Sequence, residues 1–121
     1  MPAITRLEDI LAWQRARELV REIYKLTEDG RLSRDFGLRD QICRAAVSAM
    51  SNIAEGFGRK SDKEFAHFLD MARGSATEVQ SLLYVALDIG YVNQQAFDRL
   101  HRKATETVSL IAGFTAYLRR P

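Results

Sequence analysis

The sequence predicts an all-α protein, folded as an antiparallel up-down-up-down four-helix bundle. Apolar residues recur at steps of three and four along four long segments, which is the spacing of one helix face. The only prolines are Pro2 and Pro121, so no proline interrupts these segments. No alternation of apolar and polar residues extends far enough to indicate a strand. At 121 residues, the chain is expected to form a single domain over residues 1–121.

Local signals set the expected bounds of the first two helices. The first is predicted over about Leu7–Glu28, because Thr5-Arg6-Leu7-Glu8 has the spacing of a capping box and Asp29-Gly30 is a stop signal. The second is predicted over about Asp35–Phe57. It ends in Gly56-Phe57-Gly58, where a glycine suits the left-handed residue that closes many helices.

The third and fourth helices are predicted in the same way. Ser61-Asp62-Lys63-Glu64 is a second capping box, and the helix that it opens is expected to reach about Ile89, before Gly90. The last helix is predicted from Asn93, a good N-cap residue, to about Leu118. Connections this short force each helix to turn back on the one before, which produces the antiparallel bundle.

The formal net charge of +2 hides an uneven distribution. Residues 1–30 carry −1, residues 31–63 carry +3, residues 64–92 carry −3, and residues 93–121 carry +3. One interpretation is that the charge of solvated faces simply varies. The other is that unlike faces serve a partner, which could be a second copy, an acidic protein or the phosphates of a nucleic acid.

Composition and motifs point away from secretion, membranes and catalysis. Cys43 is the only cysteine, the N-terminus has no signal-peptide pattern, and no apolar run is long enough to span a bilayer. We therefore expect a cytoplasmic protein. Cys43 lies among apolar residues of the second predicted helix, and no nucleophile elbow or phosphate-binding glycine loop is present. We expect no catalytic residues and no cofactor.

A metal centre is also not expected. Four-helix bundles can hold two irons through Glu-x-x-His pairs, and Glu64-x-x-His67 has that spacing, with Asp98-x-x-His101 as a near match. If the third and fourth helices turn back near residue 91, however, the two histidines lie about 22 Å apart along the bundle. Glu64 is better explained by its capping box.

A polar stripe interrupts the apolar second helix. Ser48, Asn52 and Glu55 follow at i, i+4 and i+7, so they share one face. An antiparallel third helix would place Gln41 beside Glu78. We favour an internal hydrogen-bond network that sets the register of the two helices over a ligand site, because buried polar groups need partners.

Basic residues are the candidates for external contacts. The loop after the second helix, Gly56–Lys63, combines three cations with Phe57, which could meet nucleic acid through phosphate contacts and stacking. The alternative is an ordinary turn, with Phe57 folded onto the end of the bundle. The predicted nucleic-acid contacts are Arg39, Arg59, Lys60, Lys63, Arg99, Arg102 and Lys103.

The stretch RAAVSAMSNIAEGFGRKSDKEFAHFLDMARGSATE, residues 44–78, carries a recognisable pattern. It resembles the four-helix-bundle family of proteins encoded by intervening sequences in bacterial 23S ribosomal RNA genes, which is related to the accessory variability protein of diversity-generating retroelements. The resemblance implies a ring-shaped homopentamer and no established enzymatic reaction. It also implies that the characteristic positions, forming a structural polar network together with packing residues, are Asn52, Glu55, Gly56, Arg59, Phe65, Phe68, Arg73, Ser75 and Glu78.

Two functions follow as hypotheses. The first is a non-enzymatic homo-oligomer that binds RNA or a ribonucleoprotein as an accessory protein. The second is a purely structural or protein-interaction scaffold in which the uneven charge matches one subunit to the next.

Overall fold

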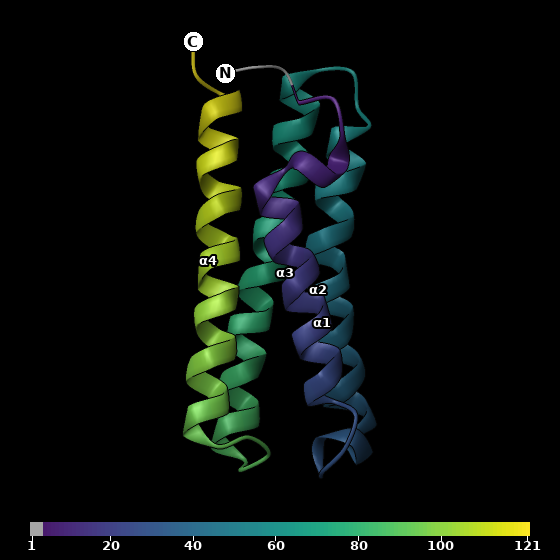
Figure 1. Ribbon diagram of the computed structural model, residues 1–121, viewed down its shortest axis with the longest axis vertical. Helices are drawn as coiled ribbons and strands as arrows, with labels where there is room; N and C mark the ends of the chain where they lie inside the picture. The colour runs from purple at the N-terminus through teal and green to yellow at the C-terminus, as the bar shows by residue number, and fades with distance from the viewer. Residues whose placement is uncertain (1–3) are drawn as a thin grey trace.

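The computed structural model describes residues 4–121 and contains four antiparallel helices (Figure 1). In chain order these are α1 (Leu11–Leu26), α2 (Phe36–Phe57), α3 (Asp62–Asp88) and α4 (Gln94–Leu118). Two short 3₁₀ turns, Leu7–Asp9 and Leu32–Arg34, precede α1 and α2. The helices pack as α1 on α2, α2 on α3, α3 on α4, and α4 back on α1, so the predicted all-α four-helix fold is confirmed. None of the helices in the described part is both long and apolar enough to cross a membrane.

The first helix is shorter than predicted. Ile10 adopts an extended conformation, with φ −79° and ψ 114°, and separates the 3₁₀ turn from α1. The prediction of a capping box at Thr5–Glu8 is wrong. Arg6 occupies the N-cap position of the turn, and no side chain forms a capping hydrogen bond there. Ile10 is only 2% exposed, so breaking the helix here lets its side chain enter the core. The Gln14 amide fixes the turn by donating to the Glu8 carbonyl at 2.7 Å.

The other helix starts agree with their sequence signals. The side chains of Asp35, Ser61 and Asn93 each accept a hydrogen bond from the backbone N–H three residues later. The left-handed glycine expected after α2 is absent, since Gly58 has φ −76°. Positive φ occurs instead at Gly30 and Gly90, in the loops at the other end of the bundle.

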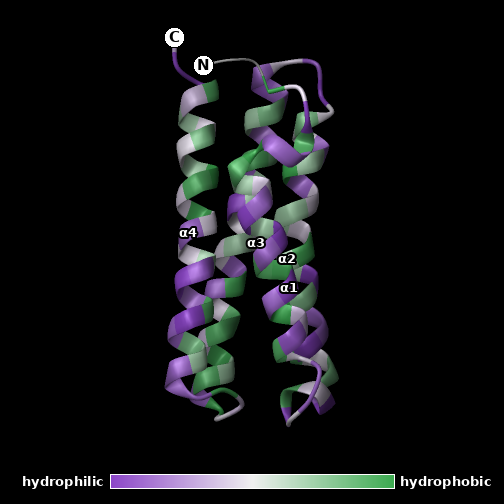
Figure 2. Cartoon of the chain, in the orientation of Figure 1, coloured by the Kyte–Doolittle hydropathy of each residue, from purple (hydrophilic) through white to green (hydrophobic). Residues whose placement is uncertain are grey.

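The core consists of two apolar clusters arranged along the bundle axis. One surrounds Leu19, Ile42 and Leu83 near the α1–α2 and α3–α4 loops, and the other surrounds Ile53 and Leu69 nearer the termini. Figure 2 shows the first half of α4 as hydrophilic and its second half as more hydrophobic. The charged residues of α4 therefore lie mainly in the half away from the termini.

Gly56 allows α2 and α3 to approach closely where the chain turns between them. A Cβ atom at this position would lie 2.7 Å from Phe65 Cδ1, 2.9 Å from Phe68 Cβ and 3.1 Å from the Phe65 carbonyl oxygen. These separations are shorter than van der Waals contact, so a side chain here would push α3 away. This packing explains the glycine better than helix termination does.

Replacing Gly56 by alanine is expected to destabilise the fold. Overpacking at a tight contact costs about 1–3 kcal/mol, which exceeds the gain in helix propensity of about 1 kcal/mol. Gly74→Ala is the matched control, because Gly74 lies within α3 and a Cβ there meets nothing within 4 Å. Urea unfolding should give a lower free energy of unfolding for Gly56→Ala and an equal or higher one for Gly74→Ala. Equal values for the two variants would contradict the close-approach argument.

Two ion pairs align α1 with α4. Arg15 Nε lies 2.7 Å from Glu106 Oε1, and Arg99 Nη1 lies 2.7 Å from Glu22 Oε2. The hydrogen bond from Arg99 holds the pKa of Glu22 below its ordinary value of 4.5, against the opposing effect of partial burial. Nearby positive charge on Lys25 and Lys103 lowers this pKa further.

The Glu22 pair should make stability depend on pH in the acid range. Because the pKa of Glu22 is lower in the folded chain than in the unfolded chain, its contribution is present above pH 4.5 and is lost as the pH falls through the folded value. Arg99 is half exposed, so the contribution should not exceed about 1 kcal/mol. Glu22→Gln should therefore lower the free energy of unfolding at neutral pH and approach wild type in acid, below the folded pKa of Glu22. A constant difference between these pH values would exclude this linkage.

Candidate functional site

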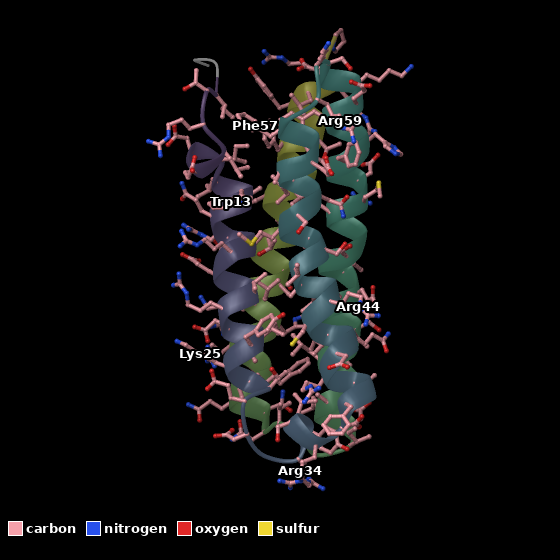
Figure 3. The ribbon with its side chains drawn as sticks, turned by 90° about the vertical axis from the view of Figure 1, so that its right-hand side faces the viewer. Trp13, Lys25, Arg34, Arg44, Phe57 and Arg59 are labelled. Carbon is pink, nitrogen blue, oxygen red and sulfur yellow. The ribbon has the colours of Figure 1, made fainter. Side chains whose placement is uncertain are left out.

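The structure does not bring the predicted nucleic-acid contacts together. Arg59, Lys60 and Lys63 lie at the α2–α3 turn, whereas Arg39 lies at the start of α2. The length of α2 separates Arg39 from Arg59 by about 30 Å. In Figure 3, Arg34, shortly before α2, and Arg59, just after it, lie at opposite ends of the bundle. These residues therefore do not form one continuous surface, and their contact with nucleic acid stays a prediction.

Internal partners occupy three of the seven predicted cations. Arg59 lies 3.6 Å from Glu55 and 4.6 Å above the Phe68 ring. Arg39 pairs with Asp40 at 3.0 Å, and Arg99 pairs with Glu22. The other four of the seven, Lys60, Lys63, Arg102 and Lys103, form no ion pair within residues 4–121.

Several side chains at the ends of the bundle are less available for external contacts than the sequence suggests. Phe57 packs edge-to-face on Phe65, with ring centroids 6.3 Å apart, so it folds onto the bundle rather than projecting outward. Arg119 donates to Asp70 at 2.6 Å and lowers the pKa of that carboxyl group. At the other end, Arg31 donates to the Gly90 carbonyl at 2.6 Å. These contacts use the terminal cations to join helices and loops.

A basic surface that the sequence reasoning missed lies where α1 meets α4. Arg21 and Lys25 are exposed on α1 one turn apart, and the Glu22–Arg99 pair places them beside the part of α4 that carries Arg102 and Lys103. Lys25 and Lys103 both lie close enough to Glu22 to lower its pKa. We call the four residues Arg21, Lys25, Arg102 and Lys103 the basic α1/α4 face.

A signal for this face exists in the sequence, but the segment charge hides it. Arg17, Arg21 and Lys25 follow at steps of four, which places them along one side of a helix. Residues 1–30 nevertheless sum to −1, because Glu18 and Glu22 lie in the same helix. Those two acids pair with Arg15 and Arg99, so they do not neutralise Arg21 or Lys25. Only the pairing pattern reveals which cations remain free.

Ser48, the first residue of the polar stripe of α2, lines a groove of about 680 Å³ between α2 and α3. Ser48 Oγ and Ser75 Oγ lie 2.9 Å apart, and Asn52 donates to both the Oγ and the carbonyl of Ser48. Gln41 donates to Glu78 at 3.3 Å, the pairing expected from an antiparallel register. These bonds fix how α2 and α3 are aligned.

Two residues of the expected polar network lie outside it. Glu55 pairs with Arg59 at the end of α2. Arg73 forms no ion pair in the described chain, and only its carbonyl is engaged, by the Thr77 hydroxyl. The network is therefore smaller than the set of characteristic positions implied by the resemblance.

The remaining groups of chemical interest have local packing partners. Cys43 Sγ lies 3.6 Å from the Thr27 hydroxyl, and His67 packs against Phe68. His101 stacks on Phe97, with centroids 5.1 Å apart. Across the described residues, no three His, Cys, Asp or Glu side chains are grouped so that they could hold a metal ion. Free cations and hydrogen-bonding groups are therefore the chemistry that this surface offers.

Comparisons with known proteins agree with the fold. A solved structure of a protein of unknown function from the S23 ribosomal protein family of Bacteroides thetaiotaomicron superposes with a TM-score of 0.79, at 20% sequence identity. The match covers 91% of this chain and 100% of that one. The search of curated proteins gave no match. The family model of the 23S rRNA-intervening sequence protein matches residues 8–113, and the chain therefore belongs to the 23S rRNA-intervening sequence protein family.

Proposed function

We propose that this chain is a non-catalytic, homo-oligomeric accessory protein of the cytoplasm that binds RNA through its basic α1/α4 face. The observation that carries the proposal is the charge that remains after internal pairing. Arg21, Lys25, Arg102 and Lys103 have no acidic partner among residues 4–121, although acids of the same two helices are already paired. Four free cations on adjacent helices suit phosphates.

The charge also limits the kind of binding. A formal net charge of +2 is low for a protein that coats nucleic acid, so a single subunit should bind weakly. Several copies in one assembly would present several such faces, and linked sites bind more tightly than one. Self-assembly, such as the pentamer that the family resemblance implies, would therefore raise the affinity for RNA above that of a single face.

The RNA proposal can be tested by neutralising the face. The combination of Arg21→Gln, Lys25→Gln, Arg102→Gln and Lys103→Gln removes up to four phosphate contacts. The affinity for a labelled single-stranded RNA, measured by fluorescence anisotropy, should fall. The slope of log affinity against log salt should become shallower by about 3, since each contact contributes about 0.7.

A matched control changes four cations at the opposite end, Arg59, Lys60, Lys63 and Arg120, to glutamine. It alters the net charge equally and should change RNA affinity far less. Light scattering on each variant shows whether assembly persists. Absence of RNA binding by wild type at low salt would refute RNA binding and leave the scaffold alternative. Equal losses in the two variants would refute the assignment to the α1/α4 face.

A further inference from the structure

Three aromatic rings gather at the surface where α3 meets α4. The ring centroid of Tyr84, on α3, lies 4.8 Å from that of Phe97 and 5.2 Å from that of His101, which are both on α4. The His101 ring stacks on Phe97, with centroids 5.1 Å apart and an angle of 26° between the ring planes. We call Tyr84, Phe97 and His101 the α3/α4 aromatic cluster.

The α3/α4 aromatic cluster has a buried base and an open outer side. Phe97 is 6% exposed and belongs to the core, whereas His101 is half-buried and Tyr84 is 50% exposed. Contacts within the bundle therefore hold the Tyr84 ring in place without covering it. An exposed ring that is fixed by two others offers a surface on which a further flat ring can stack.

The side chains next to the rings are polar, uncharged and fixed. Gln80 of α3 donates a hydrogen bond to the Thr105 hydroxyl of α4 at 2.9 Å, one turn along from Tyr84 and His101. The Thr105 hydroxyl in turn donates to the His101 carbonyl at 2.9 Å. Amide and hydroxyl groups of this kind can bond to the sugar or the base edge of a nucleotide.

Arg102 connects the α3/α4 aromatic cluster with the basic α1/α4 face. Arg99 faces α1, where it pairs with Glu22, whereas His101 faces α3, where its ring contacts Tyr84. Successive residues of a helix are turned by about 100°, so Arg102 projects outward between these two sides of α4. Arg102 is exposed and has no acidic partner within residues 4–121. A strand with a phosphate on Arg102 can therefore place a base on the rings.

Acidic side chains restrict the path of such a strand. Asp88 follows Tyr84 by one turn of α3, and Asp98 precedes His101 by one turn of α4, so both lie on the side of the α3–α4 loop. Like charges repel, so phosphates should avoid this side of the rings. The strand is therefore expected to pass over Arg102, away from the loop, and to meet the rings with a base rather than a phosphate.

We propose that the α3/α4 aromatic cluster stacks an unpaired base of an RNA whose phosphates lie on the basic α1/α4 face. This inference rests on the proposed function and specifies its substrate as RNA with unpaired bases. Bases within a duplex are covered by their neighbours, whereas bases in single strands, loops and bulges can stack on aromatic side chains. Every base has a π face, so the cluster selects for unpaired bases rather than for a particular sequence.

Changing the Tyr84 ring without changing charge tests this contact. Tyr84→Leu keeps an apolar side chain against Phe97 but removes the exposed ring, whereas Tyr84→Phe retains a ring. In fluorescence anisotropy, Tyr84→Leu should bind a short labelled single-stranded RNA at least about 5-fold more weakly than wild type, and Tyr84→Phe should bind it as wild type does. All three proteins should bind an RNA duplex of the same length equally. The slope of log affinity against log salt should stay unchanged, because the phosphate contacts remain.

Tyr24→Leu is the matched control. Tyr24 is 49% exposed, like Tyr84, but it lies beside α2 and outside the cluster. This variant should bind single-stranded RNA as wild type does. Both tyrosines are well exposed, so circular dichroism should show folded helices in each variant. Should Tyr84→Leu nevertheless unfold, His101→Leu removes the second accessible ring and should weaken single-strand binding while leaving duplex binding unchanged.

The outcomes separate this inference from the proposed function. A wild type that binds no RNA at low salt would overturn the proposed function and this inference with it. A wild type that binds RNA, together with a Tyr84→Leu variant of undiminished affinity, would overturn only the stacking contact. Equal weakening by Tyr84→Phe or by Tyr24→Leu would also overturn it, because neither change removes a ring from the cluster. So would an equal loss of duplex and single-strand binding in Tyr84→Leu, since a paired base cannot reach the rings.

Discussion

The close packing of α2 against α3 is the constraint on which the rest of the molecule depends. Near the turn, Gly56 leaves room for Phe65 and Phe68, and farther along the pair Ser48 and Ser75 share a hydrogen bond of 2.9 Å. Small residues at both levels let the two helices lie close and fix their register. That register decides which side of α3 enters the core. It also leaves Met71, Val85 and Ile89 of α3 largely exposed.

The contact between α1 and α4 has a different chemistry. Charged side chains align these helices, through Arg15 with Glu106 and Arg99 with Glu22. Each pair removes one cation and one acid from the external charge. The cations that remain, rather than the net charge of +2, define the surface available to an anionic partner. The α2–α3 contact is held by tight packing and the α1–α4 contact by paired charges, so two opposite sides of the bundle differ in chemistry.

Local features of this fold follow from the sequence more closely than long-range ones do. Helix starts at Asp35, Ser61 and Asn93 followed from side chains that cap their own backbone, which is a local interaction. The first start was misplaced because burial of Ile10 outweighs the local capping signal at Thr5. Which of the predicted basic contacts are occupied internally was likewise not apparent from the sequence. Arg39 and Arg59 pair with near neighbours in the sequence, Asp40 and Glu55, whereas Arg99 pairs with the distant Glu22.

By itself, the sequence determined the all-α class, the four helices, their antiparallel order and the Gln41–Glu78 level of α2 against α3, because helical periodicity and short connections leave few alternatives. Only the tertiary structure decided which charges remain free. Side chains such as Glu22 and Arg99 lie 77 positions apart, and their pairing depends on how α1 and α4 rotate against each other. The same rotation decides which apolar rows the core covers. The surfaces that could meet RNA or a second copy are therefore set by packing rather than by composition.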